Sequence, residues 1–446
     1  MFKRKIYDKL LNWKKESDGK TALLIEGARR IGKSTVVEAF GKQEYKSYIL
    51  IDFAQSSTDL MNLFDDMMDL NYFFLRLQLQ YNTTLYERNS LIIFDEVQLC
   101  PKARQAIKAL VKDGRYDYIE TGSLISIKKN VKDILIPSEE RKIQMYPMDY
   151  EEFLWALGDE HTNNLLELAY SSMRPLGNEV HRKMMRSFRL YMLVGGMPQA
   201  VSTYIETNNF KLVDDVKRDI INLYEDDLKK IDSTGRLSMM FEAIPSQLNK
   251  NAQNFKVKSV INSYYVKEDT ILSLIAELKD SKIVNIGYHA NNPDVGLSAY
   301  KDLNKFKIYM GDTGLFVTMH FKDSDFTENV IYEKLLNNKL STNLGYIYEN
   351  AVSQILVSMG YDLFYYTFKN ESQKTNYEID FIIPKLNKIC PIEVKSNRYT
   401  KHESIDKFYE KYSSRILNRY IIHTKDISKD RDINCIPIYL TQFINK

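Results

Sequence analysis

The stretch Gly27-Ala28-Arg29-Arg30-Ile31-Gly32-Lys33-Ser34 decides how the first part of this sequence folds. It fits the pattern GxxxxGK[ST], follows an apolar run at Thr21–Glu26 that predicts a short buried strand, and leads into a helix predicted for Lys33–Phe40. Its two fixed glycines permit turn geometries closed to other residues, so successive N–H groups can face a phosphate at the helix N-terminus. This order of strand, loop and helix predicts a binding loop for a nucleoside triphosphate.

The residues of this loop have distinct predicted roles. Lys33 should reach the β and γ phosphates, and the Ser34 hydroxyl is a suitable Mg²⁺ ligand. A chance glycine-rich turn is the alternative, and the flanking strand and helix count against it. The residues expected to contact the nucleotide are Gly27, Ala28, Arg29, Arg30, Ile31, Gly32, Lys33, Ser34 and Thr35.

A second motif supports the same interpretation. The apolar run Leu91–Phe94 predicts a doubly covered parallel strand, and it ends in Asp95-Glu96 at the carboxyl edge of the expected sheet. Asp95 is expected to hold Mg²⁺ through water, and Glu96 to orient and deprotonate the water that attacks the γ-phosphate. Alone, an acidic pair after a strand is usually a solvated turn. Its position about 60 residues after a phosphate loop, with a strand predicted for Ser47–Phe53 in between, favours the catalytic role.

Two further positions are candidates for sensing the γ-phosphate. A strand at Tyr118–Glu120 ends in Thr121-Gly122-Ser123, where Thr121 is the first choice and Ser123 the second, although this tripeptide is also an ordinary turn. Arg141 opens a strand-like segment and could stabilise charge or simply lie on the surface. Alternation of strands and helices to about Tyr150 predicts an α/β fold with a parallel sheet.

Bulk properties limit the class of protein. The chain has 446 residues, which predicts two to four domains. Its 62 basic and 59 acidic residues give a net charge of only +3, so contact with nucleic acid would need a local basic face. The three cysteines are far apart, and no signal peptide or run of about 20 apolar residues occurs. We therefore expect a cytoplasmic protein without a membrane segment.

The middle of the chain is predicted to be helical from Asp149 to about Asp232. Gly195-Gly196-Met197-Pro198 interrupts it, and from these residues alone a plain turn between helices is favoured over a special role. The part from Met239 to Phe316 alternates short helices with a late strand pair, as in a winged helix. Contact with protein and contact with DNA both stay open, because acidic residues nearly cancel five lysines, Lys256, Lys258, Lys267, Lys279 and Lys282.

The C-terminal part carries a second group of candidate site residues. Strands predicted at Tyr377–Ile383 and Pro391–Lys395 form a hairpin. Period-two alternation then places Glu393 and Lys395 on one face beside Asp380, and Glu349 on a helix predicted for 345–359 could complete a site. Such a site could hold Mg²⁺ through Glu349, Asp380 and Glu393, with Asp380, Glu393 and Lys395 as catalytic residues of a nuclease. Cross-strand ion pairs on a solvated face are the alternative.

Together these motifs resemble the bacterial and archaeal AAA-type ATPases whose C-terminal domain is related to the PD-(D/E)XK nucleases, and the resemblance runs end to end. It implies that Gly196 to Pro198 belong to a lid that closes on the nucleotide base, with Pro198 contacting the nucleotide. Arg30 departs from the glutamine frequent in relatives, and the segment before Arg141 lacks their usual glycine. The motifs that carry the resemblance are residues 27–34, Phe94-Asp95-Glu96-Val97-Gln98, Thr121-Gly122-Ser123, Val194-Gly195-Gly196-Met197-Pro198, Phe306-Lys307-Ile308-Tyr309, Asp312-Thr313-Gly314-Leu315, Tyr348-Glu349-Asn350, Glu378-Ile379-Asp380-Phe381 and Ile392-Glu393-Val394-Lys395.

The resulting expectation is an ATPase domain at 1–148, a helical lid at 149–235, a winged helix at 236–317 and a nuclease-like α/β domain at 318–446. ATP and Mg²⁺ are the expected ligands. The leading hypothesis is an ATP-hydrolysing enzyme whose nucleotide state controls a DNA-directed, Mg²⁺-dependent nuclease site. The alternative is a nucleotide-switched binding or signalling protein whose C-terminal domain does not cleave. Assembly into a homo-oligomer is left open.

Overall fold

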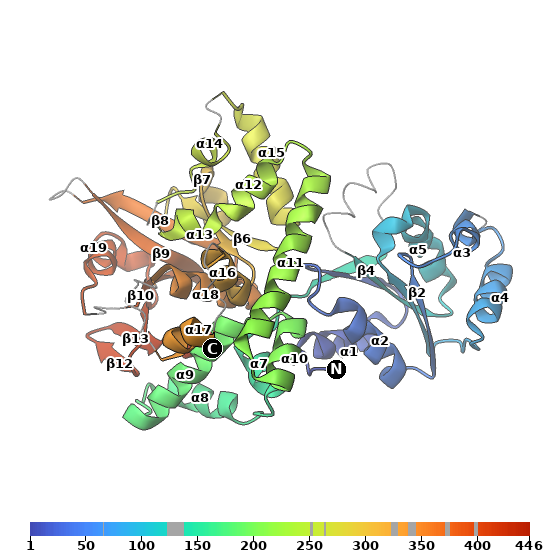
Figure 1. Ribbon diagram of the computed structural model, residues 1–446, viewed down its shortest axis with the longest axis horizontal. Helices are drawn as coiled ribbons and strands as arrows, with labels where there is room; N and C mark the ends of the chain where they lie inside the picture. Colours follow the sequence, from blue (N-terminus) through green and yellow to red (C-terminus); the bar gives the residue numbers. More distant parts are fainter. Residues whose placement is uncertain are drawn as a thin grey trace. The chain divides into compact units, whose positions relative to one another are not determined.

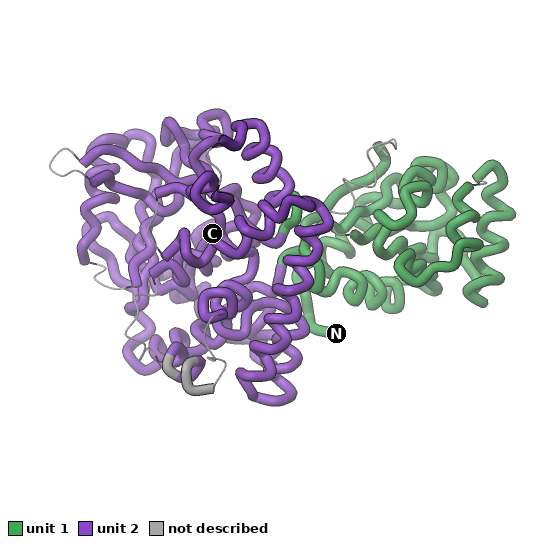
Figure 2. The backbone as a smooth tube through the Cα atoms, turned by 45° about the horizontal axis from the view of Figure 1, so that its top comes forward, with its two compact units in different colours: residues 1–146, 280–282 green, residues 147–279, 283–446 purple. Residues whose placement is uncertain are grey.

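The computed structural model describes residues 1–65, 67–122, 138–249, 253–262, 265–322, 329–337, 345–370, 375–396 and 400–446. Its contacts divide the chain into two compact units (Figure 2). The first contains residues 1–146 and 280–282, and the second contains residues 147–279 and 283–446. Among the described residues, no helix combines the length and the apolar character that a membrane span needs.

A five-stranded parallel sheet forms the centre of the first unit (Figure 1). Its strands lie in the order β2-β3-β4-β1-β5, which confirms the expected α/β class. The strands are β1 Ala22–Glu26, β2 Ser47–Asp52, β3 Ser90–Asp95, β4 Asp117–Gly122 and β5 Glu140–Gln144. The helices are α1 Ile6–Ser17, α2 Lys33–Glu44, α3 Thr58–Asn62, α4 Leu70–Tyr81 and α5 Pro101–Asp113.

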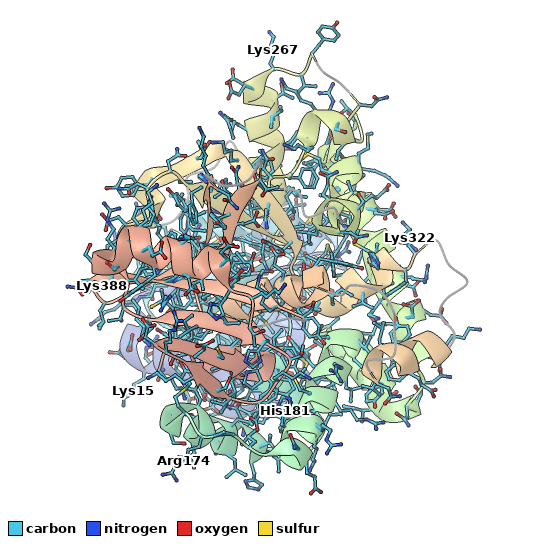
Figure 3. All side chains as sticks on the ribbon, turned by 90° about the vertical axis from the view of Figure 1, so that its left-hand side faces the viewer. Lys15, Arg174, His181, Lys267, Lys322 and Lys388 are labelled. Carbon is cyan, nitrogen blue, oxygen red and sulfur yellow. The ribbon has the colours of Figure 1, made fainter. Side chains whose placement is uncertain are left out.

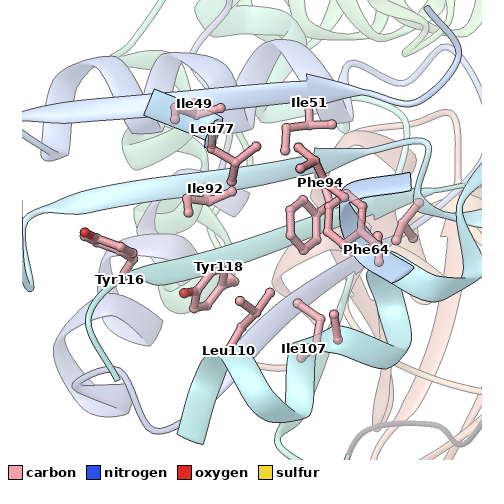
Figure 4. Close-up of a cluster of buried hydrophobic side chains, with 14 of the residues drawn as sticks. Ile49, Ile51, Phe64, Leu77, Ile92, Phe94, Ile107, Leu110, Tyr116 and Tyr118 are labelled. Carbon is pink, nitrogen blue, oxygen red and sulfur yellow. The ribbon is translucent and has the colours of Figure 1, made fainter. Parts of the chain in front are cut away.

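Helices cover both faces of this sheet, and this explains why its strands β1 and β3 contain continuous apolar runs. All residues of β3 are buried. Ile92 and Phe94 face a cluster that includes Leu110 of α5 (Figure 4). Leu91, one residue along, faces the opposite side, where its side chain lies close to Gly41 of α2. The alternation places one set of side chains under α5 and the other under α2.

The second unit joins a helical segment to a mixed eight-stranded sheet. The sheet order is β12-β13-β11-β10-β9-β8-β6-β7. Its strands are β6 Val284–Ala290, β7 Lys301–Met310, β8 Leu363–Lys369, β9 Asn376–Lys385, β10 Lys388–Lys395, β11 Arg419–His423, β12 Ser428–Asp430 and β13 Ile433–Pro437. The helices are α7 Tyr150–Ala156, α8 Thr162–Ser172, α9 Asn178–Val194, α10 Pro198–Thr207, α11 Phe210–Ile231, α12 Arg236–Glu242, α13 Ile244–Asn249, α14 Val257–Val260, α15 Glu268–Asp280, α16 Thr313–His320, α17 Asn329–Leu336, α18 Gly345–Ser358 and α19 Glu403–Tyr412.

The structure places the strand pair that we expected in a separate winged helix in a different part of the fold. β6 and β7 do pair antiparallel, but β6 also pairs in parallel with β8 through Gly287 and Leu363. The pair is therefore part of the C-terminal sheet, and the expected boundary at residue 317 falls inside α16. Local sequence could reveal the hairpin but not its outer neighbour, because that neighbour lies more than 70 residues later in the chain.

Helices cover both faces of the large sheet as well. α18 packs on β7 and β10, and α19 packs on β9. The neighbouring β8 residues Tyr365 and Tyr366 show that these are opposite faces: the ring of Tyr365 lies 5.5 Å from Lys307 Nζ, and that of Tyr366 lies against Phe408 of α19. α9 is tied to the last segment of the chain by His181, labelled in Figure 3, whose ring nitrogens lie 3.0 Å from the Tyr439 hydroxyl and 3.1 Å from the Thr424 carbonyl.

The break between α9 and α10 is a close backbone contact with α16. The Gly196 N–H donates to the Asp312 carboxylate over 2.6 Å, and the Gly196 carbonyl accepts from the Met148 N–H over 2.7 Å. A Cβ on Gly314 would lie 2.5 Å from the Gly195 Cα. Both glycines are needed because the two backbones touch.

Gly314→Ala is expected to destabilise the second unit by about 1–3 kcal/mol, because the added methyl group would meet backbone atoms of Gly195 and Val194 that cannot move aside. Gly296→Ala is the control, because its methyl group meets no atom within 4 Å and only the positive φ of 81° has a cost. Thermal unfolding of the full chain, followed by circular dichroism, measures both. A Gly314→Ala variant that is no less stable than Gly296→Ala would contradict the close-contact explanation.

Candidate functional site

The loop between β1 and α2 has the backbone that the sequence predicts for phosphate binding. Gly32 has φ 92° and directly precedes the first residue of α2. A Cβ on Gly27 would lie 2.5 Å from the Met145 carbonyl oxygen, so a larger residue does not fit there. The loop therefore ends at an open helix N-terminus, where free N–H groups and the helix dipole favour an anion.

Lys33 is the buried cation of this loop. Its side chain is 7% exposed, and its ammonium group donates to the carbonyls of Gly27 over 3.1 Å and Ala28 over 2.8 Å. Burial lowers the pKa of Lys33 to about 8, and the negative charges of Glu96 and Asp95 offset only part of this effect. The ammonium is thus held inside the loop by carbonyl oxygens, with two carboxylates close enough to affect it.

Asp95 connects two other predicted site residues, Ser34 and Thr121. The Ser34 hydroxyl donates to Asp95 Oδ1 over 2.8 Å, and the Thr121 hydroxyl donates to the same oxygen. The strand order explains this, because β4 lies between β1 and β3 and the carboxyl ends of parallel strands meet at one edge. The other sensor candidate, Ser123, lies outside the described residues.

Glu96 stands one residue further, in a left-handed conformation with φ 54°. Its carboxylate accepts a hydrogen bond from the side-chain amide of Gln98, in the 3-10 helix Val97–Leu99. A conformation of this kind in a residue other than glycine is uncommon and marks sites where geometry is imposed. Gln98 orients Glu96, a role that we did not assign to it from the sequence, although it lies in one of the quoted motifs.

Arg4 supports the loop from the start of the chain. Its guanidinium donates to the Ile31 carbonyl over 2.8 Å and to the Tyr146 carbonyl over 2.7 Å, and the residue is buried. No local pattern distinguishes Arg4 from the other basic residues near the N-terminus. Its contact with Ile31 spans 27 residues, a relation that local patterns do not encode.

The other residues predicted to contact or sense the nucleotide are not part of the hydrogen-bonded group around Asp95. Arg30 is exposed with φ 68°, and Thr35 is exposed on the first turn of α2. Arg141 forms an ion pair with Glu16 over 3.4 Å, with both side chains at least half exposed, which matches the surface role. Pro198 is the first residue of α10 in the second unit.

Three carboxylates gather in the second unit, on α18 and β9. One oxygen each of Glu349, Glu378 and Asp380 lies within 4.8 Å of the others. The third member of this group of carboxylates differs from the prediction: it is Glu378, where we expected Glu393. Glu378 and Asp380 are two residues apart on one strand, so period-two alternation already placed them on one face.

A lysine and a tyrosine from β7 enter this acidic group. Lys307 Nζ lies 3.0 Å from Glu349 Oε1 and also donates to Glu378 Oε1. The Tyr309 hydroxyl donates to the same Glu349 oxygen over 2.6 Å. Lys307 and Tyr309 also follow period two in the sequence, but only the sheet order brings β7 to this position.

Glu393 and Lys395 form a neighbouring pair on β10. Lys395 Nζ lies 2.5 Å from Glu393 Oε1, and the Val394 N–H donates to Asp380 Oδ2 over 2.7 Å. The register pairs Ile392 with Phe381, so Glu393 stands beside Asp380 at the next step. Within the described part of the chain, no hydrogen-bond partner reaches the buried Glu393 Oε2.

Burial and mutual repulsion shift the titration of these groups. Burial and the charge of Glu349 raise the pKa of Asp380 well above its usual value. Burial alone would lower the pKa of Lys307, but the charges of Glu349 and of other neighbours, Glu378 included, outweigh it and hold the pKa well above its ordinary value. Lys307 is therefore an ammonium ion at neutral pH, and it compensates carboxylates that burial disfavours as anions.

Two of the lysines considered as a basic face line a pocket together with an acidic residue. Lys256, Lys258 and Lys267 are exposed, and Figure 3 labels Lys267. Lys256 and Lys258 line a pocket of about 560 Å³ that Glu268 also lines. Opposite charges therefore meet at this surface, as the sequence suggested.

Three family models match consecutive parts of the chain. An AAA domain matches residues 19–154, a domain of unknown function (DUF8612) matches residues 185–325, and another domain of unknown function (DUF4143) matches residues 344–441. The search of curated proteins found no match.

Solved structures of other proteins are distantly similar. The Walker-type ATPase PABY2304 of Pyrococcus abyssi is 14% identical, with 72% of this chain and 96% of that chain covered and a TM-score of 0.42. The Orc1 protein of Aeropyrum pernix in complex with DNA is 11% identical, with 72% and 93% covered and a TM-score of 0.24. Both TM-scores are below 0.5, so these likenesses are distant. The family models establish that the chain carries an AAA-type P-loop ATPase domain, which implies nucleotide binding, followed by two domains of unknown function.

Proposed function

We propose that this protein binds and hydrolyses ATP and that its nucleotide state controls a DNA-directed, Mg²⁺-dependent nuclease-like site in its C-terminal domain. The observation that carries the ATPase part is the convergence of Ser34 and Thr121 on one oxygen of Asp95. Three side chains, from the first turn of α2 and from two strands, meet there beside Lys33. Such an arrangement suits the binding and cleavage of a polyphosphate.

The residues at this site have separate tasks. Phosphate oxygens replace the carbonyls of Gly27 and Ala28 as partners of the Lys33 ammonium, which then neutralises negative charge. Glu96, oriented by Gln98, accepts the proton of the attacking water. Thr121, bonded to Asp95, is placed to respond when the γ-phosphate is lost.

Mg²⁺ fits the first site because Ser34 Oγ and Asp95 Oδ1 are hard oxygen donors only 2.8 Å apart. When bound, the ion neutralises charge on the phosphates. Ser34 and Asp95 would hold it, directly or through water, and Thr121 would keep the Asp95 carboxylate in position.

The C-terminal part of the proposal rests on Asp380, Glu393 and Lys395. The buried Glu393 Oε2 beside Asp380, which has no hydrogen-bond partner among the described residues, is the position where a divalent cation fits, since a buried carboxylate oxygen without a donor is otherwise unfavourable. Bound there, Mg²⁺ would supply activation of water for attack on a phosphodiester. Lys395 would position this water. Glu349, expected as a further ligand, is already bonded to Lys307 and Tyr309.

One observation favours the alternative, a nucleotide-switched binding protein that does not cleave. The Lys307 ammonium already pairs with two of the carboxylates and offsets part of their charge, so this domain can be stable without metal. In that case the lid residues Gly196 to Pro198 and the region assigned to a winged helix would transmit nucleotide state to a binding surface. Cleavage assays distinguish the two functions.

Lys33→Ala should abolish nucleotide binding or turnover, because no other residue of the loop supplies a buried ammonium. Glu96→Gln should still bind ATP but hydrolyse it about 10²–10⁴-fold more slowly, since it keeps the shape of Glu96 and loses the base. Lys42→Ala and Glu87→Gln, which change exposed residues of the same unit, are the controls. Binding is measured by calorimetry and turnover by phosphate release. Normal hydrolysis by Glu96→Gln would remove Glu96 from its proposed role.

ATP affinity should fall as pH rises through about 8. Burial lowers the pKa of Lys33 to about 8, so the ammonium is charged below this pH and loses its proton above it. Affinity should therefore be highest below pH 8 and decrease toward tenfold per pH unit between about pH 8 and pH 9.5. A fluorescent-nucleotide titration measures it, with Lys42→Ala as a control of unchanged pH profile. A flat profile across this range would show that Lys33 does not titrate there.

Plasmid and single-stranded DNA should be cleaved by the wild-type protein with Mg²⁺ or Mn²⁺ and ATP. Asp380→Ala and Lys395→Ala should each reduce the rate about 10²-fold or more, because they remove a metal ligand and the group that positions water. Lys429→Ala, an exposed substitution in the same domain, is the control. The measurement is the appearance of nicked and linear products on gels. Equal activity in all four proteins would rule out a nuclease site at these residues.

A further inference from the structure

Lys307 places a buried ammonium group between two carboxylates of the C-terminal domain. Its Nζ lies 3.0 Å from Glu349 Oε1 and bonds to Glu378 Oε1, and its side chain is only 7% exposed. The contacts join β7 to α18 and β9 across 42 and 71 positions of the chain. Tyr309 donates to the same oxygen of Glu349, so this oxygen already accepts from two donors.

The acidic group therefore has two halves that differ in their partners. In the first half, Glu349 and Glu378 share the Lys307 ammonium. In the second half, Asp380 stands beside Glu393, which bonds to Lys395 through Oε1. Its other oxygen, Oε2, is buried and has no hydrogen-bond partner among the residues that the structure describes. One half already holds a fixed cation, and the other retains a ligand atom with no partner in the described part of the chain.

We infer that Lys307 takes the place of a second metal ion, so that a single divalent cation binds in the Asp380–Glu393 half and none binds between Glu349 and Glu378. This inference rests on the proposed metal site and specifies how many ions it holds. Two-metal sites hold their ions about 3.5–4 Å apart through shared carboxylates. An ammonium bonded to Oε1 of Glu349 and Oε1 of Glu378 stands between the two carboxylates and repels a divalent ion at that distance.

Lys395 does not have the same role. Its ammonium contacts Glu393, two residues away on the same strand, and its side chain is 28% exposed, so it can move toward solvent or substrate. Lys307 is held on two sides by groups from different elements and is four times less exposed. Lys395 therefore suits a group that moves during the reaction, and Lys307 suits a fixed charge.

Titration of the full chain with Mn²⁺ by calorimetry, without nucleotide, tests this. The wild type should bind one ion in this domain, and Glu393→Gln should lose it. Lys307→Met, which removes the charge but keeps the length of the side chain, should bind a second ion, and adding Glu349→Gln should abolish that second event. Lys305→Met is the matched control, because Lys305 lies on the same strand, is 53% exposed and pairs with Asp302 outside the cluster. It should bind as the wild type does.

The numbers of ions bound by the wild type and by Lys307→Met separate the possible outcomes. Binding of one ion by both the wild type and Lys307→Met would overturn the inference and leave the proposed metal site intact. No ion in the wild type but one in Lys307→Met would support the role of Lys307 and contradict the proposed metal site. No binding by either protein would overturn both. If Lys307→Met does not fold, Lys307→Gln, which is neutral but keeps hydrogen-bond donors, replaces it under the same criteria.

Discussion

A charged side chain inside an α/β domain must be compensated, and this constraint shapes both units of the protein. Lys33 is enclosed by carbonyl oxygens of its own loop, and Lys307 by carboxylates of two other elements. Lys217 of α11, which is fully buried, donates to the carbonyls of Leu193 and Gly314. Each ammonium lies where several elements meet. Its partners therefore determine how those elements are arranged, because breaking one of these pairs would leave an uncompensated charge in the interior.

In the first unit, the same requirement is satisfied at the carboxyl edge of a parallel sheet. Parallel strands end together, so the loop after β1, the acidic pair after β3 and the threonine on β4 occupy one small region. Asp95 accepts two hydroxyl hydrogen bonds there, from Ser34 and Thr121. Arg4 and Gln98 then fix the loop and Glu96 from outside. The geometry of the site is maintained by groups that themselves need not touch nucleotide.

In the second unit, α18 connects the acidic group to the Gly195-Gly196 contact. Glu349 faces Lys307. The next residue, Asn350, accepts from the Met310 N–H over 2.8 Å, and one turn later Gln354 accepts from the Thr313 N–H over 2.8 Å. Thr313 begins α16 directly after Asp312, the residue that holds the Gly196 N–H. The glycine motif expected to form a lid is thus part of the same hydrogen-bonded structure as the acidic group. A displacement of α16 would therefore change the positions of both the glycine motif and the acidic group.

The sequence alone determined what depends on neighbours along the chain. The strand, the glycine loop and the helix around Lys33 were predictable from local pattern, as were Asp95 at a strand end and Asp380 and Lys395 on the strands of a hairpin. Tertiary structure alone decided that Arg4 holds Ile31, that Glu378 joins Glu349, and that β6 and β7 belong to the large sheet. The reason is physical: strand order and register depend on how whole faces pack, and packing brings together residues whose separation in the chain carries no local pattern.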